Sequence, residues 1–252
     1  MKNKILSLIM IFLTLSVVAQ VSKPIDTSAI IIHQNIKFNS KQLIIPAVLI
    51  GYGAIGSVNN DLKRLNLSIR NQIVEQGYKK TTVDNYIQYV PALSVYALNN
   101  LGIKGKNNLK DRSVILGTSL ALVFVSVTAI KHIANVERPD GTNFAFPSGH
   151  TAMAFSGAEF LYQEYKDVSI WYGVGGYAIA TTTGALRIYN NKHWLTDVAA
   201  GAGIGILCTK AAYWLNPFLN EKIFNRKASN TTTMFTPYYD GKIMGGELVL
   251  MF

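Results

Sequence analysis

Long apolar segments separated by short polar connections dominate the pattern of this chain. Apolar positions recurring every three to four residues indicate helices, and long apolar runs indicate buried or membrane-spanning helices. No alternation of strands and helices is visible along the sequence. The apolar segments are 43–57, 86–103, 113–131, 148–164, 169–186 and 196–215, and a more polar segment with helical spacing covers 58–82. The pattern predicts an all-α fold, a bundle of about six apolar helices embedded in a membrane.

Small residues are concentrated in the last three of these segments, as in closely packed membrane helices. Earlier in the chain, Gly51-x-Gly53-x-x-Gly56 matches a dinucleotide-binding fingerprint. That fingerprint requires a preceding strand and a parallel sheet, and the rest of the chain favours helices. We therefore interpret these glycines as positions where two helices approach closely.

The first nineteen residues have the organisation of a secretory signal peptide. Lys2 and Lys4 precede the apolar run 5–18, and Val17-Val18-Ala19 is a small-residue cleavage site. The alternative is an uncleaved membrane anchor, for which the run is short. Either interpretation predicts an exported chain, located in a membrane with its active site facing the periplasm or exterior. A soluble periplasmic protein remains the alternative.

Composition supports the membrane interpretation and limits the partners. Only 15% of residues are charged, against about 25% in typical soluble domains, and the mean hydropathy is +0.21. The net charge of +10 suits anionic partners. Because no arginine-rich stripe or nucleic-acid motif is present, we expect no nucleic acid as partner. Cys208 is the single cysteine, so neither an intramolecular disulfide nor a cysteine-based metal site is expected.

Three basic residues lie at the ends of predicted helices. Lys131 and Arg138 are seven positions apart, so a continuous helix would place them on one face before Pro139 ends it. Arg187 follows the apolar segment 169–186. Three converging cations could bind a tetrahedral dianion, with Arg donating in pairs and Lys acting as a point charge. Each one alone could equally be a helix C-cap.

The segment Pro147-Ser148-Gly149-His150 precedes another predicted helix. Ser148 suits the N-cap, and free backbone N–H groups at a helix start can bind phosphate oxygens. Gly149 has no side chain, so an anion could approach the backbone closely. His150 could protonate a leaving oxygen, although a lone histidine here could also be a surface residue.

His193 and Asp197 are four positions apart, and on a helix they would share one face. A carboxylate bonded to one imidazole nitrogen fixes the tautomer and frees the other nitrogen for nucleophilic attack. An ordinary surface pair or a zinc site are the alternatives. The chain has no HExxH motif and only four histidines, with His33 and His132 outside this set, so a closed zinc site is not expected.

Together these segments resemble the type 2 phosphatidic acid phosphatase and vanadium haloperoxidase superfamily. Its pattern is Lys, six residues, Arg-Pro, then Pro-Ser-Gly-His, then Ser-Arg, five residues, His, three residues, Asp. Every charged and catalytic position is matched in order and spacing over about residues 85–215. One departure is Leu186, which stands where the family usually has Ser.

The resemblance implies a role for each residue. His193 attacks phosphorus to form a phosphohistidine, Asp197 orients His193, and His150 protonates the leaving oxygen and later activates water. No metal and no cofactor are implied. The phosphate-binding residues would be Lys131, Arg138, Ser148, Gly149 and Arg187. The active site is then expected at one end of the bundle.

Four functions are compatible with this pattern. The leading hypothesis is a membrane phosphatase acting on lipid phosphates or diphosphates; the second is a soluble exported acid phosphatase acting on small phosphoesters. A vanadium haloperoxidase would use the same anion-binding residues to hold vanadate. A non-catalytic membrane scaffold would not need the intact set of charged residues. The predicted organisation is a signal peptide (1–19), an N-terminal arm and first helices (20–84), a catalytic domain (85–215) and a tail (216–252) whose end could form one strand packed on the body.

The expected membrane topology contains a conflict. A cleaved signal places residue 21 outside, and three spans at 43–57, 86–103 and 113–131 would then place Lys131 inside. The basic loop 104–112 instead favours the inside by the positive-inside rule, so that 113–131 runs outward. One of the first two segments is therefore expected to be interfacial, or buried without spanning.

Overall fold

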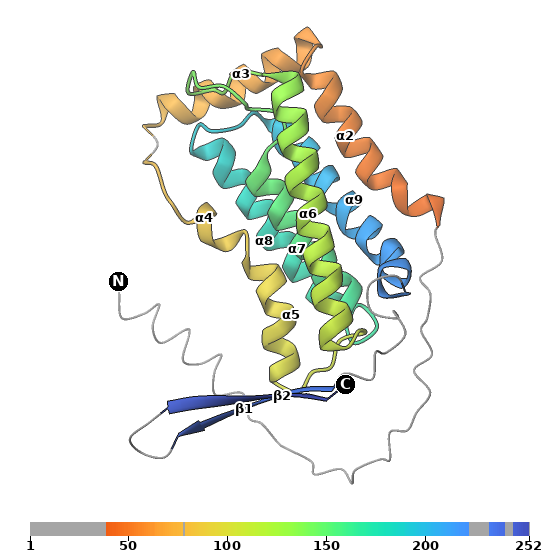
Figure 1. The fold of residues 1–252 in the computed structure, drawn as a ribbon. Helices are drawn as coiled ribbons and strands as arrows, with labels where there is room; N and C mark the ends of the chain where they lie inside the picture. Colours follow the sequence, from red (N-terminus) through yellow and green to blue (C-terminus); the bar gives the residue numbers. More distant parts are fainter. Residues whose placement is uncertain (1–38, 78, 222–231, 240–243, 252) are drawn as a thin grey trace. The chain divides into compact units, whose positions relative to one another are not determined.

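The computed structural model describes residues 39–77, 79–221, 232–239 and 244–251. The predicted signal peptide, the rest of the arm to residue 38 and parts of the tail lie outside the described residues. The elements in chain order are η1 (Ser40–Leu43), α2 (Ile44–Gly56), α3 (Asn60–Glu75), α4 (Asp84–Ile87), α5 (Val90–Asn100), α6 (Leu109–Ala134), α7 (Gly149–Tyr165), α8 (Ile170–Tyr189), α9 (Leu195–Leu219), β1 (Thr232–Tyr239) and β2 (Met244–Met251) (Figure 1).

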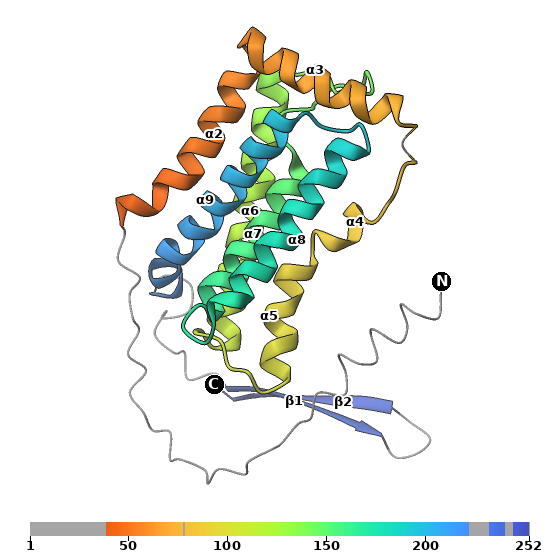
Figure 2. The ribbon, with the colours of Figure 1, turned by 180° about the vertical axis from the view of Figure 1, so that it is seen from behind.

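Helix α7 is the centre of the bundle, with contacts to α5, α6, α8 and α9 (Figures 1 and 2). Its position follows from its side chains, because Ala152, Ala154 and Ala158 are fully buried and leave room for neighbouring helices. The predicted all-α bundle is confirmed. The four long helices begin and end within four residues of the predicted boundaries, and Lys110 and Arg112 belong to α6 rather than to the predicted basic loop.

Glycines let the helix backbones approach one another. A Cβ atom on Gly201 would lie 2.5 Å from the carbonyl oxygen of Ser148, so α9 can pack this closely on the start of α7 only without it. A Cβ on Gly53 would lie 2.5 Å from the Cβ of Ala200, and one on Gly56 would overlap Thr196. The interpretation of the Gly51–Gly56 pattern as helix packing is therefore confirmed for these two positions.

Two helices in the described part of the chain, α6 and α9, are long and apolar enough to cross a membrane. Helices α2 and α3 pass the same test only as a pair bent by 88°. Helix α5 has 11 residues, about 16 Å of helix, whereas a hydrocarbon core is about 30 Å thick. Neither of the first two predicted segments is thus a single helix of spanning length.

The antiparallel helices bring distant parts of the chain to one end of the bundle. Helices α6 and α8 end there, α7 and α9 begin there, and α3 lies across it (Figures 1 and 2). The loops 135–148 and 190–194 join these helix ends. All the residues predicted for the active site lie at this end.

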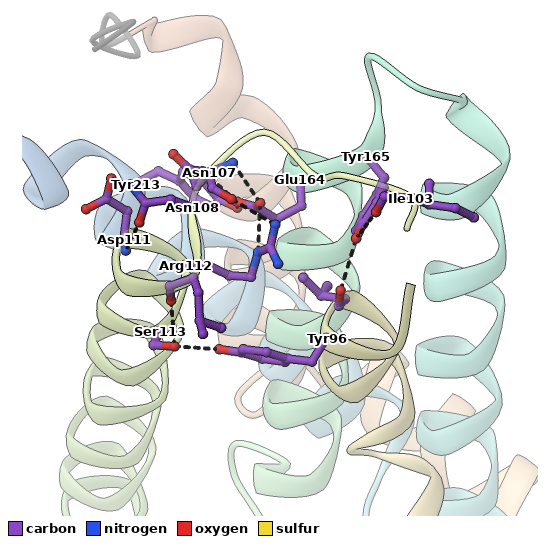
Figure 3. A network of polar contacts seen from close by, with 12 residues as sticks. Tyr96, Ile103, Asn107, Asn108, Asp111, Arg112, Ser113, Glu164, Tyr165 and Tyr213 are labelled. Carbon is purple, nitrogen blue, oxygen red and sulfur yellow. Dashed lines mark hydrogen bonds and ion pairs between the residues drawn. The ribbon is translucent and has the colours of Figure 1, made fainter. Parts of the chain in front are cut away.

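A buried polar network closes the opposite end of the bundle (Figure 3). Arg112 and Glu164, each 1% exposed, form an ion pair of 3.2 Å between Nε and Oε2. The guanidinium also donates to the carbonyl oxygen of Asn107 at 2.8 Å, while the Asn107 amide and the Tyr213 hydroxyl donate to Glu164 Oε1. These contacts attach the loop before α6 to the ends of α7 and α9.

The tail contains a hairpin that the sequence did not predict. Strand β1 pairs with β2 in an antiparallel register that sets Thr232 opposite Met251 and Tyr239 opposite Met244. The sequence suggests one strand at the end of the tail, which corresponds to β2, and β1 is the strand that the sequence did not suggest.

Candidate active site

The cations come from three different elements. Lys131 lies in the last turn of α6, Arg138 in the following loop and Arg187 in the last turn of α8. Lys131 Nζ donates to the carbonyl oxygen of Phe144 at 2.6 Å, and Arg138 Nη2 approaches the same oxygen at 3.5 Å. One carbonyl thus accepts from two cations, as a phosphate oxygen could.

The predicted continuous helix from Lys131 to Arg138 is wrong. Helix α6 ends at Ala134, because Asn135 adopts a left-handed conformation with φ of 42°. Pro139 therefore does not end the helix. The loop folds back instead, and it is held by an ion pair of 2.7 Å between Lys192 Nζ and Asp140 and by the Trp194 indole, which donates to Glu137 O at 2.8 Å. Folding of the loop, and not helix periodicity, brings Arg138 to the site.

The carboxylate of Asp140 forms a firm anchor for this loop. Partial burial tends to raise its pKa, but the hydrogen bonds from Lys192 and Thr142 outweigh burial and hold the pKa of Asp140 well below its usual range. The anchor therefore stays charged throughout the neutral pH range.

Arg187 is held by residues that lie outside the sequence motifs. It is 8% exposed, and its Nη1 lies 2.6 Å from Oδ2 of the buried Asp84 in α4. Asn190 Nδ2 donates to the other Asp84 oxygen at 3.1 Å. The sequence carries no signal for this contact beyond an acidic residue within a polar segment, because the partner lies 103 positions away.

Ser148 occupies the N-cap of α7, as predicted, but its hydroxyl makes no capping hydrogen bond. Its Oγ accepts from the Thr151 hydroxyl at 2.9 Å, and its N–H donates to the carbonyl oxygen of Asp197 at 3.0 Å. A Cβ on Gly149 would lie 3.6 Å from Val127 Cγ1. A Cβ would therefore fit in ordinary van der Waals contact, so packing alone does not require glycine here, and the close approach of an anion stays a prediction.

His150 lies in the first turn of α7, with its Nε2 2.9 Å from Oδ1 of Asn85. Burial, and next the positive charge of Arg187, lower the pKa of His150 to about 4; the charges of Arg138 and Lys131 act in the same direction, while Asp84 opposes them. The same cations therefore act on His150 and on any anion bound beside it.

His193 and Asp197 are neighbours through the cap of α9 and not through one helix face. His193 precedes the helix, and Asp197 Oδ2 accepts the N–H of the N-cap residue Trp194 at 2.8 Å. Nδ1 of His193 lies 3.5 Å from the same Oδ2, which is a contact longer than a hydrogen bond. The predicted pair is thus brought together, but the predicted imidazole–carboxylate hydrogen bond is not formed.

His193 is almost fully buried at 2% exposure. Burial, and then the charges of Lys131, Arg187 and Arg138, hold the pKa of His193 well below its usual value. The imidazole is therefore neutral at neutral pH, which is the state a nucleophile needs. The three cations act on this one side chain from separate elements, so they converge on His193.

A cavity of about 230 Å³ lies beside Asp197, between the α2–α3 elbow and the start of α9. Its walls are mainly apolar, with the Asn66 amide as a buried polar group whose oxygen has no hydrogen-bond partner. The lining residues are Gly56, Ser57, Lys63, Asn66, Leu67, Val136, Trp194, Thr196 and Asp197. In the described ranges, no group of three or more His, Cys, Asp or Glu is arranged to hold a metal ion.

Part of this chain is similar in sequence to known proteins. Residues 112–221 match the PAP2 superfamily. The lipid A 1-phosphatase of Porphyromonas gingivalis is 38% identical over 141 residues, which are 55% of this chain and 32% of that protein. The lipid A 1-phosphatase of Helicobacter pylori strain J99 is 37% identical over 131 residues, 50% of this chain and 66% of that protein. The matches thus span about one third and about two thirds of these relatives.

Two solved structures are also similar. Aquifex aeolicus LpxE is 27% identical with a TM-score of 0.45, covering 59% of this chain and 94% of that one. A PAP2-type phosphatidylglycerolphosphate phosphatase from Bacillus subtilis is 20% identical with a TM-score of 0.48, covering 73% and 99%. Together with the motifs, the match over residues 112–221 shows that this chain resembles the PAP2 superfamily.

Proposed function

We propose that this protein is a membrane phosphatase that hydrolyses lipid phosphate monoesters or diphosphates through a phosphohistidine intermediate without a metal ion. The observation that carries the proposal is the convergence of Lys131, Arg138 and Arg187 on the buried, neutral His193 beside Asp197. An anion site with a neutral imidazole nucleophile suits phosphoryl transfer.

In this mechanism, Nε2 of His193 attacks phosphorus, and the Asp197 carboxylate stabilises the positive charge that develops on the ring. Lys131 and Arg138, which now share the carbonyl oxygen of Phe144, bind phosphate oxygens instead, because a dianion is the stronger acceptor. Arg187 adds charge-assisted contacts, with its orientation fixed by Asp84. Ser148 and the Gly149 N–H contribute at the start of α7, as helix N-termini do for anions.

His150 acts on the leaving group in the first step and on water in the second. Burial and the charges of Arg187, Arg138 and Lys131 lower its pKa, and the Asp84 carboxylate opposes them only in part. A bound phosphate dianion supplies negative charge beside the ring and favours the imidazolium, so substrate binding itself protonates the acid. After proton transfer the neutral ring can accept a proton from the water that attacks the phosphohistidine.

The substrate class follows from the setting of the site and from the relatives. The site lies at one end of a bundle with two helices of spanning length, so a phosphate carried by a lipid headgroup can reach it at the membrane surface. Two relatives are named lipid A 1-phosphatases. We therefore propose a glycolipid phosphate of the lipid A type as the first candidate substrate.

The proposal is tested by phosphate release from purified protein in detergent, with EDTA present. The panel contains lipid A, phosphatidate, phosphatidylglycerophosphate, a polyprenyl diphosphate and p-nitrophenyl phosphate. We expect metal-independent release, with a kcat/KM for one of the lipids above that for the soluble ester. Complete loss on chelation, restored by zinc or magnesium, would contradict the mechanism. A preference for the soluble ester without detergent would favour the exported acid phosphatase.

Vanadate should inhibit competitively and more strongly than phosphate. It readily becomes five-coordinate and so resembles the transition state, which such a site binds more tightly than the product. Arg187→Ala should raise the Ki of vanadate at least about tenfold, since a charge-assisted hydrogen bond contributes about 1.5–3 kcal/mol. Arg64→Ala, on the exposed face of α3, is the matched control and should leave the Ki unchanged. An equal Ki of vanadate for the two variants would contradict the proposed binding of the anion by Arg187.

We further propose that the site end faces the periplasm or exterior. The loop with Lys104 and Lys106 lies at the opposite end, which favours the cytoplasm for that end. Helix α3 at the site end also carries Lys63, Arg64 and Arg70, so the two ends of the bundle differ little in positive charge. The orientation is therefore tested by whether added vanadate reaches the site. Vanadate added to cells with a permeabilised outer membrane should inhibit; inhibition only after inner-membrane lysis would reverse the orientation.

A further inference from the structure

We propose that Asn85 positions His150 for proton transfer: its side-chain carbonyl accepts a hydrogen bond from the Nε2–H group and leaves Nδ1 as the nitrogen that exchanges a proton with the leaving oxygen. This inference rests on the proposed phosphatase reaction. It assigns a role to a residue that lies outside the matched region 112–221 and outside the sequence motifs.

The position of Asn85 is fixed by its own contact with His150 and by the contacts that hold α4 to the end of α8. Oδ1 of Asn85 lies 2.9 Å from Nε2 of His150, and the preceding residue, Asp84, is 1% exposed and forms the ion pair with Arg187. Asn190 accepts from the Thr81 N–H and donates to the Thr81 carbonyl, both at 2.9 Å. The one-turn helix α4 is thereby attached to the end of α8, with two successive residues directed at two different site residues.

The protonation state of a general acid requires an acceptor at Nε2. An imidazolium carries N–H groups on both nitrogens, so its Nε2 can be paired only with an acceptor, such as the amide oxygen of Asn85. An amide N–H at this position would repel the acid form. In the neutral ring, the same hydrogen bond keeps the proton on Nε2, so that the lone pair is on Nδ1.

The side-chain carbonyl of Asn85 is important because most of the charged groups around His150 are positive and disfavour the imidazolium. The charged groups acting on His150 are Lys131 from α6, Arg138 from the loop, Arg187 from α8 and Asp84 from α4. Three are positive, and the single carboxylate is already bound to Arg187. The Asn85 carbonyl is a neutral acceptor that favours the imidazolium without neutralising the cations that bind the phosphate.

The proton transfers balance in both half-reactions. As the bond between phosphorus and the leaving oxygen breaks, its electron pair stays on the oxygen, and Nδ1–H gives that oxygen its proton. His150 is then neutral with its remaining proton on Nε2. In the second step Nδ1 takes a proton from water while the water oxygen bonds to phosphorus, the bond to His193 breaks, and its electron pair returns to the imidazole.

Two variants of Asn85 test the inference through the pH profile of kcat. Asn85→Asp places a carboxylate against Nε2 and should move the alkaline limb upward by about one pH unit, as an opposite charge within hydrogen-bond reach does. Asn85→Leu removes the acceptor; it should lower kcat by about tenfold or more and move the alkaline limb downward, with little change in KM. Asn100→Leu, at an exposed position on α5, is the matched control with no expected change.

The dependence of the rate on the leaving group distinguishes a positioning role of Asn85 from a purely structural one. p-Nitrophenolate needs little protonation as it departs, whereas an alkoxide needs a proton, so Asn85→Leu should slow an alkyl phosphate more than p-nitrophenyl phosphate. Equal loss for both substrates with an unmoved pH limb would assign Asn85 a structural role only and overturn the inference.

Nitrogen NMR of histidine-labelled protein gives a readout that does not need turnover. The chain has four histidines, so the His150 signals can be assigned by single substitutions. We expect the Nε2–H tautomer in the unmodified protein and a mixture of tautomers in Asn85→Leu. An Nδ1–H tautomer in the unmodified protein would overturn the inference, while absence of phosphate release by that protein would overturn the proposed function instead.

Discussion

Replacing His193 with alanine should reduce phosphate release by at least about 10⁴-fold, the scale reported for loss of a catalytic nucleophile or its partner. It should also abolish any acid-labile, alkali-stable phosphoenzyme trapped after mixing with labelled substrate. The reason is chemical, since the neutral imidazole beside Asp197 is the group proposed to form the bond to phosphorus. Quenched-flow trapping and steady-state phosphate release measure the two effects.

Two further variants make this result interpretable. His132→Ala removes an exposed histidine at the end of α6, whose ring has an edge contact with Phe144, and it should retain most activity. Asp197→Asn should fold and lose most activity, because the amide cannot stabilise the imidazolium. Turnover near the original level in the His193 variant would eliminate the phosphohistidine mechanism.

Glu164→Leu should produce the largest loss of stability, about 3–5 kcal/mol, because it leaves the charge of Arg112 buried without its partner. The Asn107 amide and the Tyr213 hydroxyl lose their acceptor in the same change. Thermal unfolding in detergent should show a lower Tm. At a temperature where the variant stays folded, KM should be unchanged, because Arg112 precedes Lys131 by nineteen positions, about 28 Å along α6.

A double variant and a surface variant control this experiment. Arg112→Met combined with Glu164→Leu removes both charges and should recover part of the lost stability. Asp61→Asn breaks the exposed pair with Arg64 on α3, where solvent screens the interaction, and should leave the Tm unchanged. A Tm for Glu164→Leu equal to that of the unmodified protein would show that the network in Figure 3 does not hold this end of the bundle.

The sequence by itself predicted the helices and supplied the residue types of the proposed site. Apolar segments such as 196–215 predict α9 to within four residues, because burial of an apolar face is what stabilises a helix in a bundle. The residue types and their order also come from the sequence. A Lys, two Arg and two His between apolar helices predict an anion-binding site, because an ionic group in that setting needs a partner. The match of residues 112–221 supports the resemblance to the PAP2 superfamily, and the anion-binding site stays a prediction.

Only the tertiary structure decided how those residues meet. Helix periodicity suggested one helix from Lys131 to Arg138 and one face for His193 and Asp197. The chain instead uses a left-handed Asn135 and the cap of α9 to place them. Local spacing cannot reveal such geometry, because loop conformation depends on long-range contacts such as that between Lys192 and Asp140.

The contacts of α4 show the same limit most clearly. Asp84 meets Arg187 across 103 positions, and Asn85 meets His150 across 65. No periodicity or motif connects residues so distant, and a polar segment before an apolar helix is as compatible with solvent as with a buried ion pair. Burial decides between the two, because a desolvated carboxylate must find a cation, and burial is a property of the packed helices rather than of the local sequence.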